Sequence, residues 1–420
     1  MRRGEADLGD VAPDVEAAIT GAVRDEWGRV VAALIRVTGD WDLAEECAQD
    51  AFARAAERWP RDGVPRRPGA WLTTVARNRA LDRLRRDQLG LSKLQEVAAV
   101  HATDEPTGGT GDTEDVPDDR LRLMFTCCHP ALSFETQVAL TLRTLTGMTT
   151  AEIARAFLST EATIAQRIVR AKRKIVEARI PYRMPEAGDL TVRLDEVLRV
   201  LYLLFNEGYL STGGAAAVRR DLAEDAEWLT ALLAGLLTNQ PEVLGLLVLI
   251  RLHRARDRAR LSPEGRLILL QHQDRSLWDR PVIADAVSLL ELASRMRRPG
   301  PYQVQAAIVA CHAEAATWEA TDWRQILALY DVLARFDPSP VVALNRAIAL
   351  RYVAGPAAAL ATVDTLGAPL DRYYLFHATR AELLRALART DEARDADLRA
   401  IALTANPAER SLLQERIGLH

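Results

Sequence analysis

Hydrophobic residues recur every three to four positions along most of the 420-residue chain, and strand-like alternation of apolar and polar residues is absent. The clearest pattern lies in residues 149–177, where Ile164, Ile168, Ala171 and Ile175 fall on one side of a helix. Aromatic residues make up only 5% of the chain. The pattern therefore predicts an all-α fold.

Residues 149–177 are predicted to form two short helices joined by a tight turn. Thr149 with Glu152 three positions later is a capping box, and Thr160 with Glu161 is a second N-cap signal. The opposite side of the second helix is polar and basic: Thr163, Gln166, Arg167, Arg170, Arg173 and Lys174. This layout is typical of a helix-turn-helix whose second helix enters a major groove. A basic, solvated face on an ordinary helical hairpin is the alternative.

Upstream, helices are expected over residues 23–37, 42–59 and 70–86, whereas residues 1–22 are expected to be flexible. The helix over 42–59 opens with an Asp42/Glu45 capping box. Its outward side is acidic and polar: Glu45, Glu46, Gln49 and Asp50. The helix over 70–86 carries six residues suited to phosphates or exposed bases: Arg77, Asn78, Arg79, Arg83, Arg85 and Arg86.

The formal net charge is only −4, but the charges are segregated along the chain. Residues 54–93 hold eleven Lys and Arg against four acids, and residues 94–119 hold eight acids with no Lys or Arg. Residues 91–118 are also rich in Gly, Thr and Pro, which predicts a disordered acidic linker.

Several other functional classes are not favoured by the sequence. The four cysteines have no disulfide spacing, which favours a reducing cytoplasm. Cys127, Cys128 and His129 could begin a metal site that Cys47 or His101 completes. The sequence has no second Cys/His pair at a suitable spacing, so no metal site is expected. Signal-peptide and membrane-span patterns are absent, as are phosphate-binding glycine loops and nucleophile elbows. We therefore expect a cytoplasmic protein without a cofactor or enzymatic activity.

The order of these parts resembles a known family. Residues 23–90 and 119–178 are similar to regions two and four of sigma-70 factors, in the extracytoplasmic-function subgroup that keeps only those regions. The similarity rests on DLAEECAQDAFARAAERW, AWLTTVARNRALDRLRR and TTAEIARAFLSTEATIAQRIVRAKRKI. One departure is Leu158, which stands where the turn of the family normally has glycine.

The resemblance implies three sets of site residues. Docking on the clamp helices of the largest RNA polymerase subunit falls to Asp42, Leu43, Glu46, Gln49 and Asp50. Recognition and melting of the −10 element falls to Arg66, Arg67, Trp71, Arg77, Asn78, Arg79, Arg83, Arg85 and Arg86. Recognition of the −35 element falls to Thr160, Glu161, Thr163, Ile164, Gln166, Arg167, Arg170 and Arg173.

Beyond residue 180 the chain no longer resembles a minimal sigma factor. A strong helix is expected over Leu190–Tyr209, and its end at Asn206–Tyr209 is either a glycine-terminated turn or a small-ligand site. Further long helices are expected at Leu222–Leu237 and Pro241–Arg260, in an extension covering residues 181–300.

Residues 301–420 fall into helical pairs with a spacing of 34 residues, which is the tetratricopeptide period. This tail resembles that of sigma factors with a tetratricopeptide-type extension, and an intramolecular contact with the sigma modules is a possible regulatory device. The sequence therefore predicts a promoter-specificity subunit of RNA polymerase. The alternatives are a conventional helix-turn-helix regulator with a repeat sensor, and a tetratricopeptide scaffold with incidental basic helices.

Overall fold

The computed structural model describes residues 11–96, 119–157, 159–209, 216–263, 266–404 and 406–418. Over these ranges the chain is helical and contains no strand, apart from one isolated bridge between Leu261 and Leu267. It divides into two compact units, Met1–Val200 and Leu201–His420. The predicted all-α fold is confirmed.

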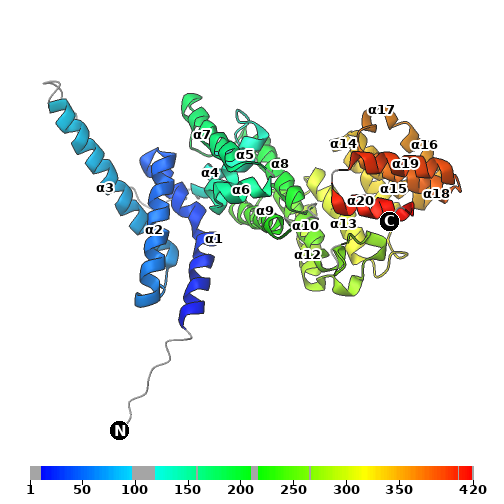
Figure 1. The fold of residues 1–420 in the computed structure, drawn as a ribbon, viewed down its shortest axis with the longest axis horizontal. Helices are drawn as coiled ribbons and strands as arrows, with labels where there is room; N and C mark the ends of the chain where they lie inside the picture. The colour runs from blue at the N-terminus through cyan, green and yellow to red at the C-terminus, as the bar shows by residue number, and fades with distance from the viewer. Residues whose placement is uncertain are drawn as a thin grey trace, which may run out of the picture. The chain divides into compact units, whose positions relative to one another are not determined.

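The first unit contains two helical groups, and α8 begins within it (Figure 1). The first group is formed by α1 (Val11–Thr38), α2 (Trp41–Asp62) and α3 (Pro68–Glu96). The second is formed by α4 (Asp119–Cys127), α5 (Phe134–Thr141), the π-helical turn η1 (Leu142–Thr146), α6 (Thr150–Ala156) and α7 (Glu161–Glu177), followed by α8 (Leu190–Tyr209).

The second unit is a series of short helices, many of them paired as hairpins (Figure 1). Its elements are α9 (Ala216–Leu236), α10 (Pro241–Arg254), α11 (Asp257–Arg260), η2 (Leu270–His272), η3 (Arg275–Leu277), α12 (Arg280–Arg295), α13 (Pro301–Glu314), α14 (Trp323–Phe336), α15 (Pro340–Ala354), α16 (Pro356–Asp364), α17 (Gly367–Leu370), α18 (Tyr374–Ala386), α19 (Thr390–Leu403) and α20 (Pro407–Arg416). The helical C-terminal domain is confirmed, and its assignment to the tetratricopeptide class stays a prediction.

The first two helices differ from the sequence-based prediction. α1 begins at Val11, so residues 11–22 are helical and not a flexible terminus. The alanine-rich sequence there favours helix, and Pro13 falls in the first turn, where proline is tolerated. The N-cap of α2 is Asp40 and not Asp42, since the Asp40 carboxylate accepts from the backbone N–H groups of Asp42 and Leu43.

α2 also continues past Pro60 to Asp62, whereas this helix was predicted to end at residue 59. Trp59 is buried against Trp71 of α3, with ring centroids 5.7 Å apart, and this contact holds the last turn of α2 in place.

In the second unit, the single helix predicted over Pro241–Arg260 is divided into α10 and α11. The predicted linker over residues 91–118 lies largely outside the described residues, as does Leu158.

Candidate nucleic-acid interface

The helix-turn-helix forms as its capping signals predict. The backbone N–H of Thr149 donates to the Glu152 carboxylate, at 2.7 Å, and the N–H of Glu152 donates to the Thr149 hydroxyl, at 3.2 Å. Thr160 caps α7 by accepting from the N–H of Thr163. The N-termini of both helices are thus fixed by local side chains.

α7 separates its apolar and polar residues between two sides. Four residues of the apolar side are buried: Ile164, Ile168, Ala171 and Ile175. Most predicted −35 residues are exposed, and Arg167 is half-buried. Ile164 has no exposed surface, and so its predicted contact with DNA is wrong. It faces the core because it lies in register with the other buried residues of this helix.

The exposed arginines of α7 have weak local partners. Arg170 Nε donates to the carbonyl oxygen of Gln166 at 3.3 Å, and Arg173 pairs with Glu177 one turn later. Such exposed contacts within one helix are weak, because solvent screens them. Both guanidinium groups can therefore exchange these partners for phosphates or base edges.

α3 presents the second basic surface. Arg77, Asn78, Arg85 and Arg86 are exposed, as are Arg66 and Arg67 on the preceding loop. Trp71 is half-buried, because its ring packs against Trp59. Arg79 and Arg83 are already engaged: Arg79 Nε lies 2.8 Å from an Asp50 oxygen, and Arg83 Nη1 lies 2.8 Å from a Glu46 oxygen.

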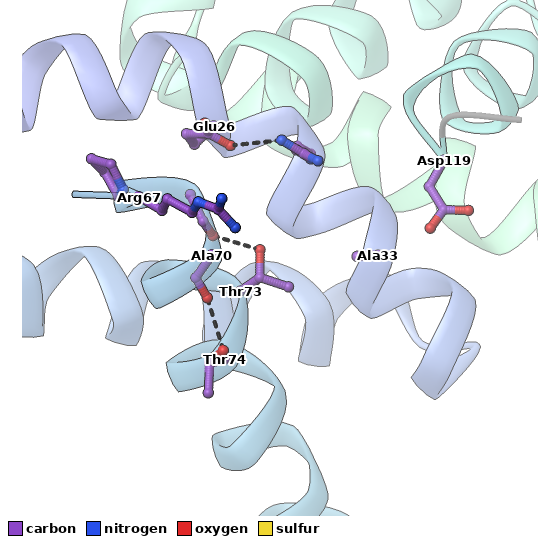
Figure 2. Close-up of a pocket in the computed structure, with 10 residues that line it drawn as sticks. Glu26, Ala33, Arg67, Ala70, Thr73, Thr74 and Asp119 are labelled. Carbon is purple, nitrogen blue, oxygen red and sulfur yellow. Dashed lines mark hydrogen bonds and ion pairs between the residues drawn. The ribbon is translucent and has the colours of Figure 1, made fainter. Parts of the chain in front are cut away.

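A polar cleft of about 810 Å³ lies beside the first turn of α3 (Figure 2). Glu26 and Arg29 of α1 line one wall, and Arg67 with Thr73 lines another. Gly69 allows this close approach, because a Cβ atom there would lie 2.2 Å from the Glu26 carboxylate. Sequence reasoning missed Glu26 and Arg29, since both lie in a helix interpreted only as core.

The predicted docking face of α2 is largely paired in this structure. Glu46 and Asp50 bind the arginines of α3, and Asp42 lies 2.8 Å from Lys172 Nζ of α7. Gln49 is exposed and Leu43 is half-buried. The acidic side of α2 thus contacts both basic helices.

Glu45 lies on the inner side of α2, where the sequence pattern predicted an exposed acid. It is only 6% exposed. One carboxylate oxygen lies 2.8 Å from Lys172 Nζ, and the other accepts from Arg143 Nε at 3.1 Å. The prediction was wrong because these two cations come from the second helical group, far along the sequence, and compensate the buried charge.

α1 provides the main contact surface between the two helical groups. At Gly28 a Cβ atom would lie 2.7 Å from the carbonyl oxygen of Leu145, and at Gly147 it would lie 2.9 Å from the Trp27 ring. The Tyr182 hydroxyl donates to the carbonyl oxygen of Ala32, at 3.0 Å. The two helical groups therefore pack tightly against each other, with contacts that reach the backbone.

Cys127 and Cys128 are structural residues in this fold. Their thiols lie 3.2 Å and 3.6 Å from the hydroxyls of Thr144 and Thr141. Burial raises the pKa of both thiols, that of Cys128 to about 12, so they stay protonated.

Among the described residues, no helix is long and apolar enough to cross a membrane.

Comparison with known families agrees with this arrangement. A model of sigma-70 region 2 matches residues 23–89, and a model of sigma-70 region 4 matches residues 122–175. Residues 193–294 match a family of unknown function, DUF6596. The two helical groups of the first unit are thus the two promoter-reading modules of a sigma-70 factor.

Individual relatives show to which subgroup of the sigma-70 factors the chain belongs. The ECF RNA polymerase sigma factor SigL of Mycobacterium tuberculosis is 30% identical over 159 residues, covering 37% of this chain and 86% of SigL. The chain belongs to this family of extracytoplasmic-function sigma factors and has its role in promoter recognition. The predicted family and function are confirmed.

Two further relatives differ in how much they share. A probable ECF RNA polymerase sigma factor of M. tuberculosis, SigI, is 29% identical over 163 residues, covering 39% of this chain and 56% of SigI. An uncharacterized protein of Rhizobium meliloti is 44% identical over 391 residues, covering 93% of this chain and 92% of that protein. The likeness to the Rhizobium protein thus includes the C-terminal unit. No solved structure matches the chain.

Proposed function

We propose that this sigma factor docks on core RNA polymerase through the acidic side of α2. Asp42, Leu43, Glu46, Gln49 and Asp50 form this surface, and the clamp helices of the largest subunit are its partner. The exposed ion pairs with Arg79 and Arg83 contribute about 0–1 kcal/mol each, so a basic partner can replace them at small cost.

The basic surface of α3 then holds the −10 element. Its exposed arginines and Asn78 contact the melted strand, and Trp71 lies at the start of the same helix. Single-stranded DNA is held by cationic grooves with aromatic platforms, which this combination provides. The cleft beside Arg67 offers polar space for an unpaired base.

α7 is the reader of the −35 element. The observation that carries the proposal is the division of this helix, with four apolar residues buried and the polar, arginine-rich side exposed. Arg167 and Gln166 are suited to forked hydrogen bonds with base edges, and Arg170 and Arg173 to phosphates.

The fused C-terminal unit is the regulator in this proposal, acting by intramolecular contact with the sigma modules. The chain performs no bond chemistry itself and works in the cytoplasm, where its polymerase partner lies. The alternative function is that of a conventional helix-turn-helix regulator. Such a regulator does not need a region 2 module, and this chain has one.

Reconstitution with core polymerase tests the proposal. The full chain should form a complex with core and produce promoter-dependent transcripts from genomic fragments. Asp50→Arg should weaken core binding about tenfold or more, because it reverses a charge at the docking face. Asp62→Arg, an exposed acid at the end of α2, should leave core affinity unchanged.

Arg79→Ala shows whether weaker core binding by Asp50→Arg comes from the reversed charge or from loss of the Asp50–Arg79 ion pair. It breaks the same ion pair as Asp50→Arg but leaves the carboxylate free, so core affinity should be kept or slightly increased. Absence of any complex with core would refute the sigma mechanism. Unchanged binding by Asp50→Arg would remove only this face from the docking site.

A further inference from the structure

Three guanidinium groups surround one indole ring in the second unit. The guanidinium carbons of Arg275, Arg280 and Arg256 lie 4.5, 5.8 and 5.9 Å from the ring centroid of Trp278. Arg256 is 8% exposed and Trp278 is 3% exposed. This cluster lies between α10 and the start of α12, so it concentrates positive charge in a partly buried place.

One carboxylate, that of Glu319, attracts the Arg275 guanidinium from beyond ion-pair distance, and it balances only part of the positive charge of the cluster. Neighbouring arginines form ion pairs, since Arg254 and Arg260 both contact Asp257. Within the described ranges, Arg256, Arg275 and Arg280 have no ion-pair partner. A buried arginine is usually paired, and Arg256 is an exception to that rule.

Helix capping accounts for part of the cluster. Arg275 Nη1 donates to the carbonyl oxygens of His312, at 2.7 Å, and Ala315, at 2.6 Å. Arg280 Nη1 donates to the carbonyl oxygen of Ala313, at 3.1 Å. These bonds satisfy the carboxyl end of α13, where cations are favourable.

Four buried donors remain after capping is counted. Arg256 Nε, Arg275 Nη2, Trp278 Nε1 and His312 Nδ1 have no hydrogen-bond partner in the part of the chain that the structure describes. Each unpaired buried donor costs about 1–3 kcal/mol. Burial and the nearby Arg256 and Arg275 lower the pKa of His312 to about 4, so its ring is neutral and can still donate one hydrogen bond.

The cluster is reachable and lies against a turn that the sequence singled out. Arg280 is exposed and Arg275 is half-buried, so one side of the cluster reaches the surface. Arg256 Nη2 donates to the Tyr209 hydroxyl at 3.2 Å, and Arg260 Nη2 donates to the Tyr209 carbonyl oxygen at 2.9 Å. The end of α8, considered above as a ligand site, is therefore tied to these arginines.

We propose that Arg256, Arg275, Trp278, Arg280 and His312 form a binding site for the oxyanion group, phosphate or carboxylate, of a small molecule. Such a group carries several acceptor oxygens and a negative charge, and so matches both the unpaired donors and the guanidinium groups whose charge is only partly balanced. Four of the five residues lie in the segment matched by the family of unknown function. The site is independent of promoter reading.

Isothermal titration of the full-length chain with inorganic phosphate, and separately with acetate, tests the site at constant ionic strength in chloride. Saturable binding of either anion is expected, and the anion that binds identifies the phosphoryl or carboxyl source. Arg256→Gln and Arg275→Gln should raise the Kd at least tenfold. Arg258→Gln is the control. Arg258 is an exposed arginine of α11, directly after Arg256, and its replacement should leave the Kd unchanged.

Arg280→Gln provides a variant that should fold, because this side chain is exposed and its two hydrogen bonds, to the carbonyl oxygens of Ala313 and Arg275, are 3.1 and 3.5 Å long. It should raise the Kd several-fold while the helical circular dichroism stays that of the parent chain. No saturable binding of either anion would overturn the proposal. The same holds if binding is equal in the parent chain and in all folded cluster variants.

Discussion

At the scale of single residues, the buried carboxylate of Glu45 holds the two sigma modules together. It comes from α2 and pairs with Lys172 of α7 and Arg143 of η1. All three side chains are less than one-fifth exposed. A charge in such a place is tolerated only with its partners, so each one depends on the other two.

Glu45→Gln should lower the free energy of unfolding by about 3 kcal/mol, because it leaves two buried cations without their shared anion. Glu46→Gln, one position later and half-exposed, should cost less than about 1 kcal/mol. Urea unfolding of the intact chain, followed by circular dichroism, measures both. Equal effects would show that the buried pair contributes no more than the surface pair.

Arg167→Ala tests base reading by α7. Loss of a forked contact should cost about 1–3 kcal/mol on promoters with the preferred −35 base and little on promoters without it. Transcription by the reconstituted holoenzyme from matched promoters measures the difference. An equal loss on every promoter would make Arg167 a phosphate contact.

Local signals at residue scale were readable from the sequence, whereas distant partners were not. The Thr149/Glu152 capping box and the Thr160 N-cap each act within three residues, and the structure contains both. Glu45 was misread as exposed, because its partner Arg143 is 98 residues away in the sequence. The cleft residue Glu26 was missed because the helix that carries it was interpreted only as core.

At the scale of elements, α1 and η1 pack closely because glycines occupy the contact. Gly147 has a φ of +80° and lies against the Trp27 ring. Gly28 lies against the backbone of Leu145. Any larger residue at either position must push the helices apart or move the ring, so these two glycines set the distance between modules.

Gly147→Ala should therefore destabilise the chain more than Gly39→Ala does. Both positions have positive φ and share a left-handed penalty of about 1–2 kcal/mol. Only at Gly147 does the new Cβ also meet a neighbour, 2.9 Å away, which adds about 1–3 kcal/mol of overpacking. Thermal unfolding midpoints of the two variants give the comparison, and identical midpoints would contradict the close packing.

Element type was predictable along most of the chain, and element ends were less so. The helix over Leu190–Tyr209 has the bounds that its hydrophobic pattern gave. The start of α1, the extension of α2 beyond Pro60 and the break at Arg256 were missed. In each case tertiary packing or weak patterning outweighed the local rule for a helix end.

At the scale of the whole molecule, the first unit extends past the predicted boundary at residue 180. Ile180 is buried, Tyr182 bonds to the backbone of α1, and Arg193 donates to the Phe125 carbonyl oxygen. The segment after α7 thus belongs to the sigma modules by contact. This segment lies beyond the region 4 match, which ends at residue 175, so the family resemblance gave no signal that it packs with the first unit.

A chain ending at Val200 should keep the parent affinity for core polymerase, and a chain ending at Arg179 should be less stable because it lacks these three contacts. Thermal unfolding and core binding of the two truncations test this. If the C-terminal unit regulates, the Val200 chain should also differ from the full chain in transcription. Equal transcription by both would make the C-terminal unit a passenger.

The pairs between Asp50 and Arg79 and between Glu46 and Arg83 have a thermodynamic consequence. Each acid belongs to the proposed polymerase face, and each arginine to the proposed DNA face. Whatever binds one partner releases the other, so the two ligands share the cost of breaking the pair. Binding of polymerase and of DNA is then positively cooperative, by about twofold to fivefold per pair, and the coupling is equal in both directions.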